Sequence, residues 1–117
     1  MIRDFFLGFI RIHVLYHAVH EPIYGLAMIE ELEGHGYEVS PGTLYPILHG
    51  MEEAGLLERT ERVVDGRVRK YYSATPDGVS ALEEAKVRIR ELVTEVLEDE
   101  GPDRLPGPSG GDESSGP

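Results

Sequence analysis

The sequence feature that most constrains the fold is the dipeptide Asp65-Gly66, which lies between two runs rich in β-branched, aromatic and charged residues. Asp-Gly is strongly favoured in two-residue hairpin loops, because such a turn needs positive φ angles at both positions. We therefore expect a hairpin within residues 56–75. A turn centred on this dipeptide predicts the following pairs: Val64 with Arg67, Val63 with Val68, Arg62 with Arg69, Glu61 with Lys70, Thr60 with Tyr71 and Arg59 with Tyr72.

The chain before residue 36 is expected to form two helices. Residues 4–19 are apolar on nearly every side, and residues 24–35 carry an apolar stripe of Leu26, Ile29 and Leu32. A helix without a polar face is normally buried all round. One domain of 117 residues can hardly cover residues 4–19, so the pattern also predicts a partner subunit.

Two further helices are each introduced by a favoured N-cap residue followed by proline, a pattern typical of helix starts. Ser40-Pro41 introduces residues 40–51, and Thr75-Pro76 introduces residues 75–98. The first of these helices is expected to bury one apolar stripe: Leu44, Ile47, Leu48 and Met51. The second carries a heptad seam suited to a dimer arm: Leu82, Ala85, Ile89, Leu92 and Val96.

Charge is distributed unevenly along the chain. The net charge of −11 by itself argues against a nucleic-acid partner. Residues 59–70, however, hold five basic side chains against two acidic ones, and exposed charges more than about 8 Å away are largely screened. Opposed like charges destabilise a strand pair, so Arg62 opposite Arg69 favours a hairpin that meets a polyanion. The alternative is a solvated ribbon whose arginine stems pack on Tyr71.

The order of three helices, a charged hairpin and a long helix is that of a winged helix-turn-helix protein, a mainly α fold (α+β) with a two-stranded wing. In that fold the third helix enters the major groove and the wing contacts the DNA backbone. The residues expected on DNA from the third helix are Thr43, Tyr45 and His49 at base edges and Ser40 near a phosphate. Those expected from the wing, on the backbone or in the minor groove, are Arg62, Arg67, Arg69 and Lys70.

Several motifs resemble those of the PadR-type transcriptional regulators. The run Gly-Thr-Leu-Tyr-Pro at residues 42–46, together with Arg-Lys-Tyr-Tyr at residues 69–72, is the most specific, and the resemblance covers residues 24–78. It implies a homodimer, usually a repressor, with residues 40–51 as the recognition helix reading an inverted repeat. It also implies dimerisation through the C-terminal helix, helped by the first helix, which carries Phe5 and Phe9.

The resemblance bears on ligands as well. Some compact family members bind flat aromatic drugs between tryptophans at the dimer centre, and this chain has no tryptophan. Release by a small ligand therefore stays an expectation without an assigned pocket. One candidate for the pocket is a central cavity lined by four aromatic side chains, although aromatic residues at such positions are more often part of a core. These residues are Phe5, Phe6, Phe9 and Tyr16.

No enzyme, cofactor or metal site is expected. The chain has no cysteine, no glycine-rich phosphate loop after a strand and no evident pair of catalytic carboxylates. His13, His17 and His20 follow one face of the first helix, with a spacing that can bind zinc or nickel. We favour the reading that these histidines simply border a buried helix. A metal- or small-molecule-sensing switch on the same scaffold is the alternative.

The expected organisation is a winged-helix domain at residues 1–75, a dimerisation helix at 76–100 and a disordered tail at 101–117, where twelve of seventeen residues are Gly, Pro or Ser. The chain lacks the features of a signal peptide or membrane span, so a cytoplasmic protein is expected. The main rival to a DNA-binding regulator is a winged helix that serves as a protein-interaction module, with its acidic body docked on a basic partner.

Overall fold

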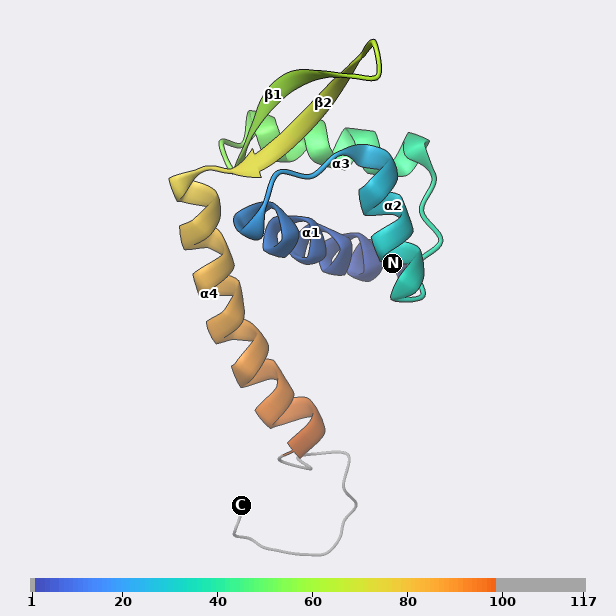
Figure 1. Ribbon diagram of the computed structural model, residues 1–117. Helices are drawn as coiled ribbons and strands as arrows, with labels where there is room; N and C mark the ends of the chain where they lie inside the picture. Colours follow the sequence, from blue (N-terminus) through green and yellow to red (C-terminus); the bar gives the residue numbers. More distant parts are fainter. Residues whose placement is uncertain (1, 99–117) are drawn as a thin grey trace, which may run out of the picture. The chain divides into compact units, whose positions relative to one another are not determined.

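The computed structural model describes residues 2–98, and the elements follow in the predicted order (Figure 1). The predicted tail at 101–117 lies outside the described residues. The mainly helical fold with one two-stranded antiparallel sheet confirms the predicted fold class. The bounds are α1 (Ile2–His20), α2 (Gly25–Gly34), α3 (Pro41–Glu53), β1 (Leu57–Val64), β2 (Arg67–Ala74), α4 (Pro76–Val93) and a final π-helical turn, η1 (Thr94–Glu98).

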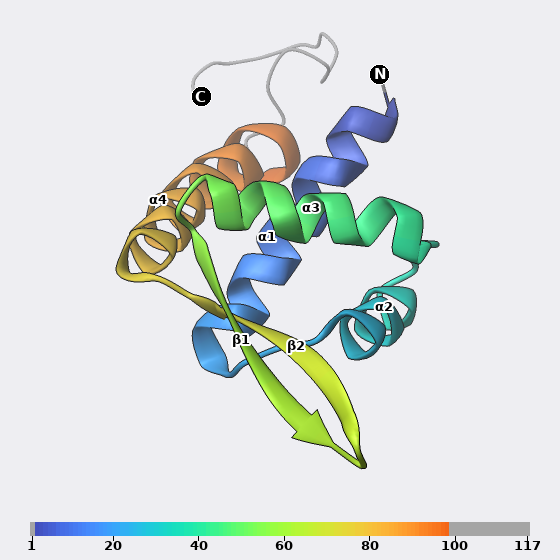
Figure 2. The same cartoon turned by 90° about the horizontal axis from the view of Figure 1, so that it is seen from above.

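The hairpin has the predicted register. Asp65 and Gly66 adopt φ angles of 53° and 77°, the positive values that a two-residue turn of this kind requires at both positions. Every predicted pair is present, including Arg62 opposite Arg69, and two more pairs continue the ladder to Leu57 and Ala74. Figure 2 shows the hairpin extending away from the helices, with α3 lying across α1.

The core lies where one face of each helix meets the base of the hairpin. The stripe predicted for α3 is buried as expected, and so is most of that predicted for α2. Leu26 was assigned wrongly, because 59% of it is exposed and Met28 lies in the core with Ile29 and Leu32 instead. The largest fully buried side chains are Tyr72, Leu32, Leu44, Leu48, Leu57 and Val14.

Helix α1 is only partly covered by its own chain. It buries Ile10, Val14, Leu15 and Ala18, which follow one helical face. Its aromatic residues Phe5, Phe6, Phe9 and Tyr16 stay exposed to solvent, and Phe5 is 61% exposed. The residues 1–83 unit therefore leaves an aromatic face of α1 uncovered, in keeping with the all-round apolar sequence of this helix.

The start of α4 is fixed by contacts that the sequence pattern partly anticipated. The Thr75 hydroxyl accepts a hydrogen bond from the Gly78 N–H at 3.0 Å, as an N-cap should, and donates to the Gly55 carbonyl. Gly78 is needed because a Cβ there would overlap the Leu56 carbonyl oxygen. Ser40 has the extended backbone of an N-cap, but its hydroxyl donates to Thr43 Oγ1 at 3.4 Å instead of capping α3.

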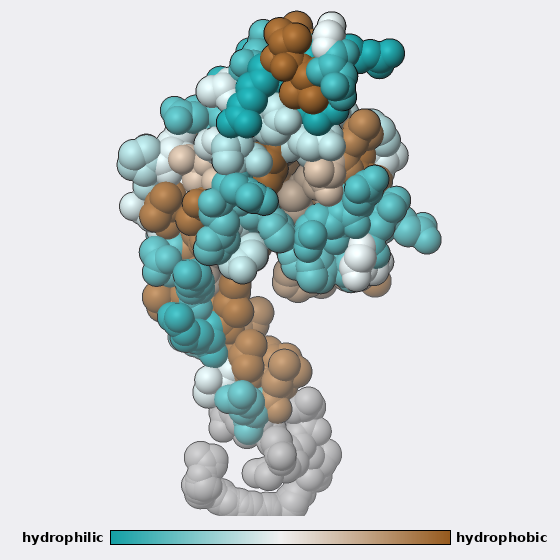
Figure 3. Space-filling view, viewed as in Figure 1, coloured by the Kyte–Doolittle hydropathy of each residue, from teal (hydrophilic) through white to brown (hydrophobic). Residues whose placement is uncertain are grey.

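The chain divides into two compact units, residues 1–83 and 84–117, and the greater part of α4 belongs to the second. Within that unit the seam residues share one helical face by their spacing. Ile89, Leu92 and Val96 are exposed, whereas Ala85 is half-buried. Figure 3 shows apolar atoms gathered along α4. Leu82 belongs to the first unit and is 4% exposed in its core, so it is already packed within the subunit, contrary to the dimer seam predicted for it.

Candidate nucleic-acid interface

The outer face of α3 is small, polar and free of acidic side chains in its first turn. Ser40 and His49 are exposed, and Thr43 is half-buried. Acidic residues appear only at the far end of α3, where Glu52 pairs with Arg59 of the hairpin at 3.7 Å. The first turns of α3 thus present its positive dipole end without a carboxylate to repel phosphate.

Tyr45 has a packing role that the sequence did not predict. Its ring lies directly against Gly25 at the start of α2, where any Cβ would overlap it. The side chain is half-buried and packs on the hydrophobic core. Tyr45 therefore holds α3 against α2, and only the exposed part of its ring is free to meet a ligand.

The wing arginines are arranged over tyrosine rings. The Arg62 guanidinium lies 4.5 Å from the centre of the Tyr71 ring, and that of Arg69 lies 4.3 Å from the centre of the Tyr24 ring. The two rings meet edge to face at 5.5 Å. Each cation is attracted to the face of its ring, which explains how two opposed arginines coexist in one strand pair. A hydrogen bond to Tyr71 raises the pKa of Arg69 further.

Pairing of the α1–α2 connection with β2 brings Tyr24 to this position. Ile23 and Tyr72 exchange two backbone hydrogen bonds, of 2.9 and 2.7 Å, so a single β-bridge ties the connection to the hairpin. Tyr24 follows and faces β2, which the sequence pattern did not indicate. The guanidinium groups of Arg62 and Arg69 thus lie over tyrosine rings, and one of these rings is the Tyr71 named in the alternative interpretation of the hairpin. The edges of these planar groups still offer N–H donors to an anion.

The remaining wing cations have no ion-pair partner within residues 2–98. Arg67 and Lys70 are exposed, and none of the four predicted wing residues forms an ion pair in that range. A hollow of about 360 Å³ connects the wing to the helices, and Tyr45 of α3 lines it together with Arg69 and Lys70. The wing and α3 therefore border a common surface.

Two basic residues of α1 extend this surface and were missed at the level of sequence. Arg3 and Arg11 line a shallow hollow of about 270 Å³ together with Gly42, Thr43 and Pro46 of α3. They are separated from α3 by some thirty residues or more, so only the fold brings them together. The only signal in the sequence would have been that the first predicted helix carries two arginines on one of its faces.

The aromatic cavity proposed for the dimer centre stays a prediction, because its residues are seen here in one subunit. A hollow of about 660 Å³ lies between the start of α1 and the α2–α3 connection, and Phe6 is the single member of the predicted set that lines it. The Phe6 ring meets Tyr37 edge to face at 6.4 Å. Phe5, Phe9 and Tyr16 instead belong to the exposed face of α1.

The arrangement of three helices and a basic hairpin defines a winged-helix protein. The family model described as the transcriptional regulator PadR-like family matches residues 14–84. The chain is 49% identical over 96 residues to the transcriptional regulator Rv3488 of Mycobacterium tuberculosis, covering 82% of this chain and 90% of that protein. This chain therefore belongs to the PadR-like family of transcriptional regulators, which are not enzymes.

Solved structures agree with this assignment. A PadR family transcriptional regulator from Eggerthella lenta is 31% identical with a TM-score of 0.72, covering 82% of this chain and 85% of its own. A PadR-like regulator from Bacillus cereus is 35% identical with a TM-score of 0.70, covering 76% and 88%. Family membership implies regulation through DNA. No helix within residues 2–98 has the length and hydropathy needed to cross a membrane.

Proposed function

We propose that this chain is a homodimeric repressor that binds an inverted-repeat operator through α3 and the wing. The observation that carries the proposal is that Arg69 and Lys70 of the wing line the same hollow as Tyr45 of α3, a helix whose first turn holds no acidic side chain. Phosphate contacts supply most of the affinity of such an interface, whereas base contacts supply the specificity.

The roles divide between the two elements. Thr43, His49 and the exposed part of Tyr45 meet base edges in the major groove, with Ser40 beside a phosphate at the positive end of α3. The wing residues contact the DNA backbone or minor groove: Arg62, Arg67, Arg69 and Lys70. In this arrangement Arg3 and Arg11 add phosphate contacts beside α3, because their hollow is lined by residues of that helix.

The dimer forms through the uncovered faces of α1 and α4. Phe5 and Phe9 are exposed on α1, and a solvent-facing aromatic stripe of this kind is normally covered by a partner. The seam on α4 comprises Ala85, Ile89, Leu92 and Val96, without Leu82. Two copies related by a twofold axis would present two recognition helices to two half-sites, which is why an inverted repeat is the expected operator.

Release from DNA by a small ligand remains part of the proposal. The exposed aromatic face of α1 supplies candidate contacts for a flat apolar molecule, although no closed pocket is built from it in the single chain. We expect a cytoplasmic protein, because a regulator of transcription has to reach the chromosomal DNA.

The test is a fluorescence anisotropy titration of the full chain against its own upstream DNA and against a scrambled duplex, at two salt concentrations. A preference of about a thousandfold or more for the native duplex, with affinity that falls steeply in salt, supports a specific regulator. Weak and equal binding to both duplexes, combined with capture of a basic protein partner, would replace this proposal with the protein-interaction alternative.

A further inference from the structure

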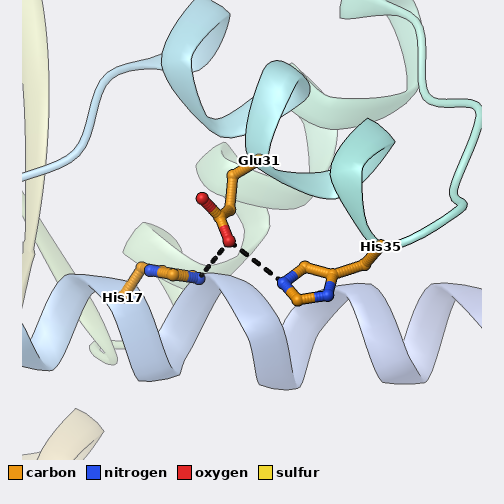
Figure 4. A network of polar contacts seen from close by, with 3 residues as sticks. All are labelled: His17, Glu31 and His35. Atoms are coloured by element: carbon orange, nitrogen blue, oxygen red, sulfur yellow. Dashed lines mark hydrogen bonds and ion pairs between the residues drawn. The ribbon is translucent and has the colours of Figure 1, made fainter.

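Three histidines and one glutamate converge where α1 meets the end of α2. The ring nitrogens of His13, His17 and His35 can all lie within 4.8 Å of one another. His13 and His17 are one turn apart on α1, and His35 directly follows α2. Figure 4 shows Glu31 reaching from α2 toward both His17 and His35.

The spacing of the glutamate and two of the imidazoles matches that of metal ligands. Glu31 Oε2 lies 3.0 Å from His35 Nε2 and 3.5 Å from His17 Nε2. Zinc bonds of about 2.0–2.1 Å arranged as a tetrahedron place neighbouring ligand atoms about 3.3 Å apart. The two distances from Glu31 Oε2 lie close to this spacing.

His13 is the third histidine of the cluster. Its ring is stacked on that of His35, with centroids 4.7 Å apart and planes inclined by 27°, and meets the Tyr37 ring edge to face at 5.5 Å. One ring nitrogen of His13 lies within 4.8 Å of a ring nitrogen of each of the other two histidines. His13 and His17 are half-buried, so the cluster is partly shielded from water.

The backbone holds the ligands in place independently of any ion. His35 occupies the C-cap of α2, where its N–H bonds to the Leu32 carbonyl at 3.0 Å, and Gly36 takes a φ of 91° directly after it. The i, i+4 spacing fixes the two α1 histidines on one side of their helix. Such preorganisation reduces the conformational entropy that the side chains lose when they bind an ion.

The charge state of the cluster also suits a cation. Burial and the neighbouring histidines lower the pKa of His13, which keeps its imidazole neutral near pH 7. The neutral imidazole is the form that binds a metal, and Glu31 supplies the one negative charge. Three nitrogens and one carboxylate oxygen favour zinc, cobalt or nickel over magnesium or calcium, which prefer oxygen ligands.

We propose that His13, His17, Glu31 and His35 bind one divalent transition-metal ion of the zinc class, which would join α1 to the end of α2. The spacing in the sequence offered His20 as the third histidine of a metal site. It gave no reason to prefer a metal site over histidines that border a buried helix. In the structure the His20 ring lies edge to face with Tyr16 at 4.6 Å, and His35 takes its place in the cluster.

The experiment is calorimetric titration of zinc chloride into the untagged, chelator-treated full chain, repeated with cobalt chloride and followed by visible absorption. We expect one ion per chain and the absorption bands of tetrahedral cobalt. His35→Asn and Glu31→Gln should each weaken zinc binding by about 100-fold or more, since residues that bind the ion directly matter at least as much as the groups that orient them. His20→Asn, a histidine of the same helix outside the cluster, should bind like the unchanged chain.

Circular dichroism in the presence of chelator checks that each variant is folded. Absence of zinc binding by the unchanged chain overturns the proposal, and so does equal binding by the His35→Asn and His20→Asn variants. In the first case the cluster would be a hydrogen-bonded cap on α2, and His35→Asn would lower the melting temperature by the same amount with and without zinc.

Discussion

Replacing Arg67 with alanine tests how the wing contributes to DNA binding. In the proposed dimer the four wing cations of each subunit make eight phosphate contacts, and each contact contributes about −0.9 to the slope of log Kobs against log salt. The wing alone therefore predicts a slope of about −7. Arg67→Ala removes one contact per subunit, which should reduce the steepness by about 2 and weaken binding about 30-fold at 0.15 M salt.

The assay is anisotropy at five or more salt concentrations on a specific and a scrambled duplex. Because a phosphate contact carries no sequence information, the loss should be similar for both. The matched control is Arg88→Ala, which removes the same charge from an α4 residue that pairs with Glu91 at 3.8 Å. An unchanged slope for Arg67→Ala, or an equal change for Arg88→Ala, would refute a backbone-gripping wing.

Three further predictions concern packing, assembly and pH. Gly78→Ala should lower the free energy of unfolding by about 2 kcal/mol or more in a urea titration, because its Cβ would overlap the Leu56 carbonyl; an unchanged midpoint would show that this contact relaxes easily. Leu92→Asp should convert the dimer to a monomer in sedimentation equilibrium, whereas Arg88→Asp on the same helix should not. His13 has a lowered pKa in the folded chain, so the unfolded chain takes up the proton more readily as pH falls below 6.5. Stability should therefore decline toward pH 5, and His13→Asn should remove part of that decline in chelator-containing buffer.

Local sequence signals predicted the hairpin and the helix starts well. Asp65-Gly66 accepts the positive φ angles that set the register, and a one-residue slip would have moved every side chain to the other face. Thr75-Pro76 likewise marked the start of α4, because cap and proline preferences act within a single turn. Such features depend on neighbours in the chain, so no knowledge of the tertiary fold was needed.

Features that depend on contacts between distant segments could not be predicted from the sequence. Leu26 and Met28 are both apolar within a short helix, and only packing against α3 and α1 decides which one is buried. The approach of Tyr45 to Gly25 and the place of Arg3 beside α3 need the helices to be assembled first. For the same reason the spacing along α1 suggested His20 as a metal ligand, whereas the fold brings in a histidine from the end of α2.

The most direct test of the account is selection of bound sequences by the full chain from a pool of random DNA duplexes. We expect enrichment of an inverted repeat whose half-site centres lie about 10 base pairs, or a multiple of that turn, apart. The Arg67→Ala variant should enrich the same repeat with lower affinity, and Thr43→Ala should enrich an altered half-site. A pool that shows no enrichment, or a single half-site without a symmetric partner, would contradict a dimeric regulator that reads DNA through α3.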